Sequence, residues 1–452
     1  MARRLSMLDG TFLNIETRDA PMHVAGLQVF QLPPKVPRDF IKRVVHTLRA
    51  AGPLARPFNL KLADVPLGRV APAMIEDRNI DLDYHVRHSA LPDPGGEREL
   101  GELVSHLHGQ ILDRSRPLWT CHVIEGLQGR RFALYVKIHH ALVDGQRAMK
   151  LFTRCLGSAP GEGNWQAFWA EREDAGRERT ARPAAARPHA IPTLEWPRLM
   201  ARALKPLLRR EAGSEPVRRP FEAPRSVLNG RVTAARRVAT QRLELARIKA
   251  VGKKHRASVN DVFLALCSTA LRRHLQESGA LPSDSLIAGV PVSLRDEHSP
   301  ADAGNAVGFL WARLGTDLDE PRARLRAIQA SMQASKQHLQ SLPAQARMAF
   351  TTLAMSPAIA VLASGLGPRL RPPMNVVISN VPGPGEPLYL GGARLEGMYP
   401  VSIPFQGLGL NITCVSYAGQ FAVGITGSRD TLPHLQRIAV YLGEALDELE
   451  AD

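Results

Sequence analysis

The chain has little cysteine, few aromatic residues and no targeting signal that its first residues reveal. Its four cysteines are spread over 452 residues, with no CxxC pair and no spacing typical of a disulfide framework. We therefore expect a reducing cytosolic setting. Aromatic residues make up only 5% of the chain, and no nucleic-acid-binding motif is present, which disfavours nucleic acid as a partner.

No uninterrupted hydrophobic run is long enough to cross a bilayer. The longest apolar stretch, 346–367, is broken by Arg347 and Pro357, and predicts buried helices or a lipid-facing surface instead of a span. The N-terminus is basic, but it reaches Asp9 without the apolar core of a signal peptide. We expect neither a signal peptide nor a transmembrane helix.

Acidic residues are outnumbered, 43 against 58 basic ones, which gives a net charge of +15. Such a balance favours anionic partners. A membrane surface or an acidic ligand such as coenzyme A fits better than nucleic acid. The length is sufficient for about two or three domains, and no metal or redox cofactor is indicated.

Strands and helices alternate along the first half, as they do in an α/β layer. The second half shows the same alternation after a long irregular region at 157–225. Period-2 and period-3.6 patterns predict strands over 26–30, 120–125, 132–140, 238–245, 287–295, 376–384, 408–417 and 420–426, and helices over 38–50, 97–110, 245–255, 262–275 and 432–449.

The region 157–225 is rich in proline, alanine and arginine and reads as a linker or crossover. Inside it, the segment 193–210 combines Trp196 and several leucines with arginines and lysine. A basic amphipathic helix of this kind can lie on an anionic membrane. The alternative is a helix packed on the fold and interrupted at Pro197 and Pro206.

The stretch 132–145 contains the main candidates for catalytic residues. Apolar residues from Phe132 to Ile138 alternate with others that include Lys137, which predicts a half-buried strand with His140 emerging on the inward face. A turn at Asp144-Gly145 and a helix follow. An oriented imidazole at a strand end can act as a base near neutral pH. A core histidine, a helix-capping Asp144 and a zinc site are the other readings. Zinc is disfavoured because adjacent strand residues point to opposite faces.

The sequence His139-His140-xxx-Asp144-Gly145 resembles the HHxxxDG motif of acyl-CoA-dependent acyltransferases. Several further motifs occur in the order typical of bacterial wax ester synthase/diacylglycerol acyltransferases, with most likeness to the marine-bacterial type. They are Leu5-Ser6-xx-Asp9, Pro21-Met22-His23-Val24, Pro117-Leu118-Trp119, Asn260-Asp261, Pro291-Val292-Ser293-Leu294-Arg295 and Ser379-Asn380-Val381-Pro382-Gly383-Pro384. Gln146-Arg147 depart from the small residues expected after the motif, which bears on substrate preference.

The resemblance implies two domains like chloramphenicol acetyltransferase, with a tunnel at their interface for acyl-CoA and the alcohol. The corresponding boundaries are 1–156 for the domain with HHxxxDG, 157–225 for the crossover and 226–452 for the second domain.

The resemblance also implies roles for single residues. His140 is the expected general base, and His139 shapes the site. Asp144 is expected to be structural, with Arg295 as its ion-pair partner. Asn260 and the Gly145 N–H are the expected hydrogen-bond donors to the tetrahedral intermediate.

Asp261 is expected to give the site structural support. It stands three residues after Ser258, close to the spacing of a capping box, so Asn260-Asp261 also fits a plain helix start.

The expected activity is transfer of a long-chain acyl group from acyl-CoA to a fatty alcohol or to diacylglycerol, for storage lipid. The enzyme is expected at the inner membrane or lipid inclusions as a peripheral protein. Two alternatives stay open: a related acyltransferase that uses a carrier-protein thioester, and a non-catalytic protein that coats lipid bodies or membranes.

Overall fold

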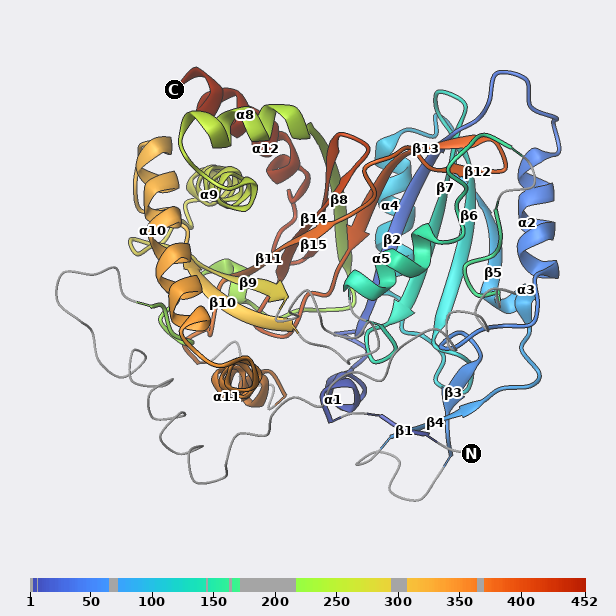
Figure 1. Ribbon diagram of the computed structural model, residues 1–452, viewed down its shortest axis with the longest axis horizontal. Coiled ribbons are helices and arrows are strands. Elements are labelled where there is room, and N and C mark those ends of the chain that lie inside the picture. Colours follow the sequence, from blue (N-terminus) through green and yellow to red (C-terminus); the bar gives the residue numbers. More distant parts are fainter. Residues whose placement is uncertain are drawn as a thin grey trace.

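The computed structural model describes residues 3–5, 7–64, 72–143, 145–161, 165–170, 217–293, 307–363 and 370–452. Two six-stranded sheets stand side by side, each with helices packed on it (Figure 1). A three-stranded sheet lies at one end of the molecule, near the N-terminus. The predicted α/β class with two lobes is confirmed.

The first sheet is built mainly from the first half of the chain. Strand β7 lies at its centre, antiparallel to β2 and β6, and a hairpin turn across 128–130 joins β6 to β7. In order across the sheet, the strands are β12 (Tyr389–Leu390), β13 (Ala393–Val401), β2 (His23–Gln31), β7 (Arg131–His139), β6 (Trp119–Leu127) and β5 (Val86–Ala90). The helices of this half are α1 (Met7–Ile15), α2 (Phe40–Ala50), α3 (Leu82–His85), α4 (Glu97–Gly109) and α5 (Gly145–Thr153).

Both faces of β7 are covered, so the prediction of a half-buried strand is wrong. One set of alternate residues, Phe132 to Ile138, packs with α2 and α5. The other set packs with α4 through Ala133 and Tyr135. Lys137, expected to face solvent, is only 4% exposed. Its ammonium donates to the carbonyls of Leu107 and Gln110, each at 2.7 Å, at the end of α4.

The second sheet has an extensive apolar core on the side covered by α9. The helices that pack on α9 lie together on that side of the sheet (Figure 1). Across the sheet, the strands are β10 (Val307–Arg313), β9 (Ile287–Ser293), β11 (Val376–Pro382), β14 (Leu410–Tyr417), β15 (Gln420–Ser428) and β8 (Arg236–Glu244). The helices are η1 (Val227–Asn229), α8 (Leu245–Lys254), α9 (Val259–Glu277), α10 (Pro321–Gln340), α11 (Ala344–Ala363) and α12 (Gln436–Ala451).

Strands β12 and β13 come late in the chain but complete the edge of the first sheet beside β2. Both strands belong to residues 226–452, and the boundary predicted at 226 stays a prediction. On its way, β13 passes close to β15: a Cβ at Gly424 would overlap the carbonyl of Pro400. Glycine at this position permits the two sheets to approach.

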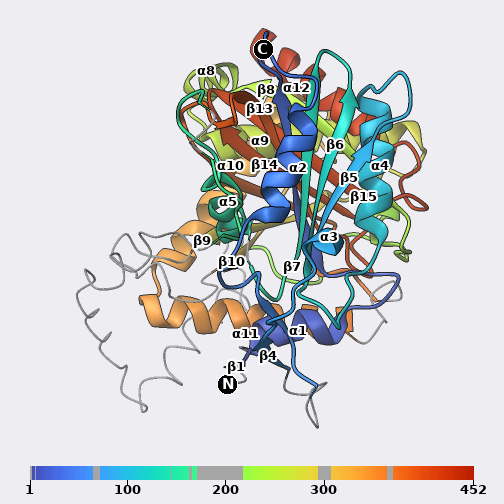
Figure 2. The same ribbon diagram turned by 90° about the vertical axis from the view of Figure 1, so that its right-hand side faces the viewer.

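The helices α1 and α11 lie at the same end of the molecule, with β1 (Arg3–Arg4) and β4 (Ala73–Glu76) nearby (Figure 2). Strand β3 (Leu60–Leu62) pairs with β4. The apolar stretch that begins near 346 forms α11, which buries Phe350 and Ala354 but leaves Leu353 46% exposed. Among the described residues, none of the helices combines the length and apolarity needed to cross a membrane. The segment 193–210 lies outside the described residues.

Candidate active site

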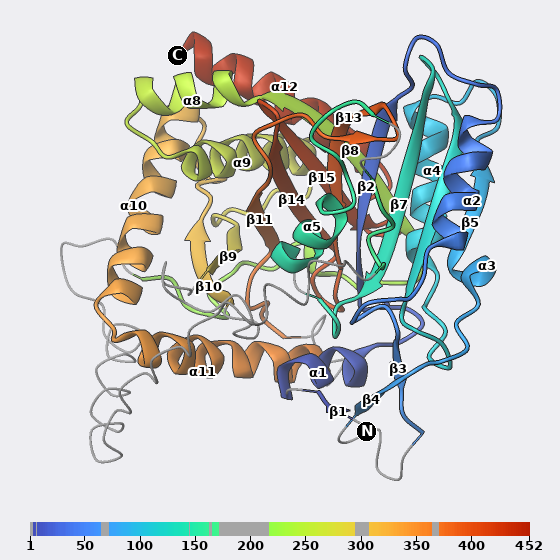
Figure 3. The same cartoon turned by 45° about the vertical axis from the view of Figure 1, so that its right-hand side comes forward.

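Strand β7 delivers the two histidines, and the chain leaves the sheet between them. His139 is the last strand residue and pairs with His23 of β2. The His140 N–H donates to the Met22 carbonyl at 2.9 Å, just beyond the ladder. Figure 3 shows this end of β7, with α5 beside the strand and α1 beneath it. The half-buried His140 thus stands at the rim of the first sheet and not inside its core.

His139 has a fixed, inaccessible ring. Its side chain is fully buried, and Nδ1 accepts the Ala141 N–H at 3.1 Å. Because Nδ1 is an acceptor, the ring proton of the neutral form lies on Nε2. Nε2 is 3.3 Å from Oε1 of Glu16, whose side chain is 1% exposed. This geometry suits a residue that shapes the site and gives substrate no access to the ring.

His140 stacks on an aromatic ring from α1. The rings of Phe12 and His140 have centroids 4.1 Å apart at 25°. An aromatic face stabilises a cation above it by about 0.5–2 kcal/mol. Phe12 therefore fixes the plane of the His140 ring and favours the imidazolium that forms when the ring takes a proton.

The N-terminus of α5 follows the histidines closely. Gly145 is its first residue and is exposed, and a Cβ there would meet no atom within 4 Å. The first N–H groups of a helix have no partner within it and carry partial positive charge. An oxyanion placed here could accept from them. Asp144 and the side chain of Gln146 lie outside the described residues, so the role expected for Asp144 stays a prediction.

Asn260 and Asp261 occupy the first turn of α9. Ser258 and Asp261 form the capping box that the spacing predicted: Asp261 Oδ2 accepts from the Ser258 N–H at 3.0 Å and from its hydroxyl at 2.6 Å. No described contact joins Asn260 to His140. Arg295 lies outside the described residues, beyond the end of β9 at Ser293. Of the residues predicted for the site, the structure describes His139, His140 and Gly145 around the end of β7 and the start of α5, and the roles of Asn260 and Arg295 stay predictions.

Sequence reasoning missed Glu16, Phe12 and the partners of His23. Glu16 and Phe12 lie just before the Pro21-Met22-His23-Val24 motif, which signalled the segment without assigning roles. Burial alone would raise the pKa of Glu16, but hydrogen bonding and charge from His139, the Met22 N–H and Arg114 outweigh it, so the net shift is downward. Glu16 is therefore a buried carboxylate held in its ionised form.

A second polar chain runs along the α4 face of the first sheet. His23 Nε2 donates to the His108 carbonyl at 2.7 Å, and His108 Nε2 donates to the Ser402 carbonyl at 2.8 Å. The Tyr135 hydroxyl is 2.8 Å from His108 Nδ1 and can donate to it. Burial lowers the pKa of His108 to about 3 and that of His23 well below its ordinary value. Both rings are neutral structural groups at pH 7.

None of the four cysteines offers a thiolate nucleophile. All are free and buried. Burial raises the pKa of the Cys155 thiol to about 12 and raises the pKa values of the other three as well, so all four thiols stay protonated at pH 7.

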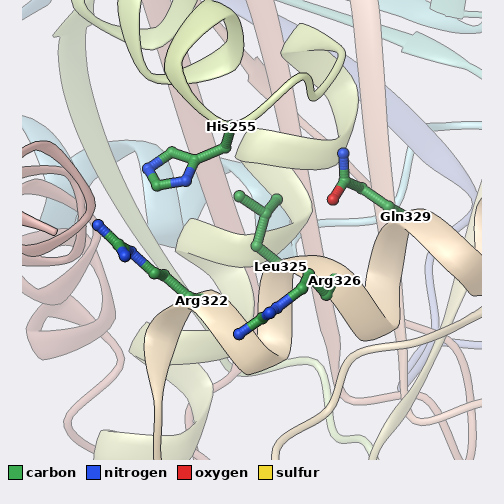
Figure 4. Close-up of a pocket in the computed structure, with 5 residues that line it drawn as sticks. All are labelled: His255, Arg322, Leu325, Arg326 and Gln329. Atoms are coloured by element: carbon green, nitrogen blue, oxygen red, sulfur yellow. The ribbon is translucent and has the colours of Figure 1, made fainter.

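A cavity of about 240 Å³ lies between the end of α8 and the first turns of α10, and neither His139 nor His140 lines it (Figure 4). His255, Arg322, Leu325, Arg326 and Gln329 line it. It shares no residue with the surroundings of His140, so it does not correspond to the predicted tunnel, which stays a prediction.

Known proteins with similar sequences share one family. Residues 5–263 match the family described as wax ester synthase/diacylglycerol acyltransferase catalytic domain, and residues 303–450 match the WS/DGAT C-terminal domain. The O-acyltransferase WSD of Acinetobacter baylyi is 38% identical over 455 residues, 99% of this chain and 97% of its own. The protein tgs2 of Mycobacterium tuberculosis, named after diacylglycerol O-acyltransferase activity, is 42% identical over 446 residues, 98% of this chain and 97% of its own.

Solved structures include a member of the same family that superposes on nearly the whole chain. The wax ester synthase/diacylglycerol acyltransferase from Marinobacter aquaeolei VT8 superposes with a TM-score of 0.80 at 38% identity, over 99% of both chains. The first condensation domain of the calcium-dependent antibiotic synthetase superposes with a TM-score of 0.57 at 16% identity, over 99% of this chain and 95% of that one. The second likeness concerns the fold alone.

Proposed function

Since the chain belongs to the wax ester synthase/diacylglycerol acyltransferase family, we propose that it esterifies a hydroxyl group with the acyl group of a long-chain acyl-CoA, and that His140 is the general base. The acceptor is a fatty alcohol, which gives a wax ester, or diacylglycerol, which gives triacylglycerol. The observation that carries the role of His140 is its placement: a half-buried imidazole with a fixed backbone N–H, stacked on Phe12 beside the start of α5.

The reaction starts from a donor that is already activated, because a thioester carbonyl is open to attack. His140 takes the proton of the acceptor hydroxyl as its oxygen bonds to the acyl carbon. The negative charge that develops on the carbonyl oxygen needs donors. The Gly145 N–H, at the N-terminus of α5, is the first such donor, and Asn260 is the second. When the carbon–sulfur bond breaks, the proton on His140 goes to the departing sulfur, which leaves as coenzyme A.

Direct transfer within a ternary complex fits this chain better than an acyl-enzyme. A covalent intermediate on cysteine would need an accessible thiolate, and the four thiols are buried and protonated. Proton transfer by His140 needs no metal or redox cofactor. Treatment with EDTA should therefore leave the rate unchanged.

We place Asp144 and Arg295 as a structural ion pair that supports the turn after His140. The support is chemical: the pair would neutralise a carboxylate beside a base. Breaking one partner of a buried pair costs about 3–5 kcal/mol, so Asp144→Ala should lower both thermal stability and turnover. Full stability with full activity would contradict the pair.

We also propose peripheral contact with an anionic lipid surface, where the apolar substrates reside. The net charge of +15 and the exposed side chains of Leu353 and Leu370 support it. Sedimentation with phosphatidylglycerol vesicles should show binding that weakens as salt is raised. Absence of binding at low salt would contradict the proposal.

Acceptor-dependent release of coenzyme A tests the activity. Purified protein is given palmitoyl-CoA alone, with hexadecanol or with dipalmitoylglycerol. We expect release only with an acceptor, and an ester product of matching mass. No release from folded protein with either acceptor would contradict the proposal and point to a carrier-bound donor, which a palmitoyl carrier-protein substrate would reveal.

A further inference from the structure

One buried carboxylate ties together the segments around His140. Glu16 follows α1, and its side chain is 1% exposed. Oε1 accepts the Met22 N–H at 2.9 Å and lies 3.3 Å from His139 Nε2. Oε2 accepts from Arg114 Nη2 at 2.9 Å and Nε at 3.2 Å. Three hydrogen bonds, from the Met22 N–H and the Arg114 guanidinium, and the His139 ring beside it explain why this carboxylate can stay ionised while buried.

Two routes lead from Glu16 to the backbone of the base. The first passes through a single residue: Met22 gives its N–H to Glu16 and accepts the His140 N–H on its carbonyl at 2.9 Å. The second passes through His139, whose Nδ1 accepts the Ala141 N–H at 3.1 Å. The peptide groups on both sides of the His140 side chain are therefore fixed by groups that Glu16 holds.

A third route fixes the ring itself. Phe12, which stacks on His140, lies in α1 four residues before Glu16. Arg114 donates to the Leu13 carbonyl at 2.7 Å as well as to Glu16. One guanidinium thus anchors the end of α1 and the carboxylate together, so the stacking ring keeps its place relative to the strand.

We propose that Glu16, anchored by Arg114, is a positioning residue for acyl transfer: it sets the place and direction of the His140 ring without touching substrate. The proposal rests on the proposed role of His140 as the base. A base must lie within hydrogen-bond reach of the hydroxyl, and a misplacement of about 1 Å can cost about 100-fold in rate. Substrate contacts are unaffected, so the loss should fall on turnover and not on binding.

Glu16→Ala is the direct variant. We expect kcat to fall about 100-fold while KM for palmitoyl-CoA stays within about twofold. Glu16→Gln keeps an oxygen for the Met22 and His139 donors, so it should retain at least about tenfold more turnover than Glu16→Ala. A folded Glu16→Ala enzyme with kcat within about twofold of the unmodified protein would overturn the proposal.

Arg114→Met covers the case in which Glu16→Ala does not fold. The Arg114 side chain is 43% exposed, so methionine keeps much of the apolar stem and removes the charge together with the hydrogen bonds to Glu16 and Leu13. We expect a fall in kcat of about tenfold, equivalent to one charged hydrogen bond, with unchanged KM. Full kcat in this variant would overturn the proposal.

Glu99→Ala is the matched control. Glu99 also accepts a backbone N–H, that of Gly96 at 2.7 Å, but at the start of α4. It should lose thermal stability without losing turnover. A loss of kcat in Glu99→Ala as large as in Glu16→Ala would show that destabilisation alone explains the effect, and would overturn the positioning role.

A spectroscopic measurement separates this proposal from the role of His140. ¹⁵N NMR of histidine-labelled protein should show His139 with its proton on Nε2, as the Ala141 and Glu16 contacts require. A proton on Nδ1 would break the second route and overturn the proposal. If His140→Ala keeps full activity, the base assignment fails instead. If His140→Ala is inactive while the Glu16 and Arg114 variants have normal activity, the role of His140 as the base is retained and the positioning role of Glu16 fails.

Discussion

The two six-stranded sheets bury very different side chains. On the strands of the first sheet, His122, Lys137 and His139 are all at most 5% exposed. Around the second sheet, the core against α9 is apolar, and buried charged groups such as Arg324 and Asp261 bond to carbonyls or cap a helix. Buried ionisable groups cost stability. Among the described residues, more of them lie in the first lobe, where His139 and Glu16 also adjoin the segment that carries His140.

The second lobe is built around an apolar core, so a substitution inside that core should act mainly on stability. Phe263 is fully buried and packs edge-on against Phe421, with the two ring centroids 5.1 Å apart. Phe263→Ala should lower the free energy of unfolding by about 3–5 kcal/mol, measured by urea unfolding. The kcat of the remaining folded enzyme should be unchanged. A kcat loss in fully folded protein would show that the second lobe acts on the chemistry.

Asn260 tests whether the first lobe alone supplies the catalytic groups, because Asn260 would bring a hydrogen-bond donor from the second lobe to the oxyanion. Its side chain forms no hydrogen bond with any residue that the structure describes. As a donor it should be worth about 100–1000-fold in kcat, so Asn260→Ala should lose that much in steady-state assays. Near-normal turnover would reduce Asn260 to a helix-start residue and leave the chemistry to the first lobe.

The buried Lys137 of the first lobe should make the stability of the protein depend on pH. Burial, followed by the charge of Arg87, lowers the pKa of Lys137 from 10.5 to about 7. Between these values the unfolded chain binds a proton that the folded chain does not, so this group makes stability rise with pH, by up to about 1.4 kcal/mol per pH unit. Urea unfolding from pH 7 to 9 should show this slope in the unmodified protein and its loss in Lys137→Met. Identical slopes would contradict it.

Asp261 should give the smallest effect. Its carboxylate serves the capping box of α9, and loss of such a cap costs about 1 kcal/mol. Asp261→Ala should lower the melting temperature slightly and leave kcat unchanged. A large loss of kcat with a small change in melting temperature would instead show that Asp261 supports the site beyond its helix.

Features set by neighbouring residues were predictable from the sequence. The β6–β7 hairpin follows from alternation and a turn, and the α9 cap from Ser258 and Asp261 three positions apart. The half-buried reading of β7 failed because alternation detects one apolar face, while Ala133 and Tyr135 are buried under α4 on the other.

Features set by distant residues were not predictable in this way. Glu16 meets His139 across more than a hundred residues, and no local pattern announces the contact. The same holds for β13, which the sequence did not predict as a strand and which joins the first sheet beside β2. The motif located His140, and only the fold shows which residues hold it in place.

The most direct test of the account is coenzyme A release from palmitoyl-CoA with hexadecanol by His140→Ala, beside the unmodified enzyme. His88→Ala is the control, since His88 pairs with Glu125 on β5 and β6, away from the site. Loss of a general base typically costs about 100- to 10,000-fold. We predict such a loss in folded His140→Ala and normal release in His88→Ala. Normal release in His140→Ala would contradict the account.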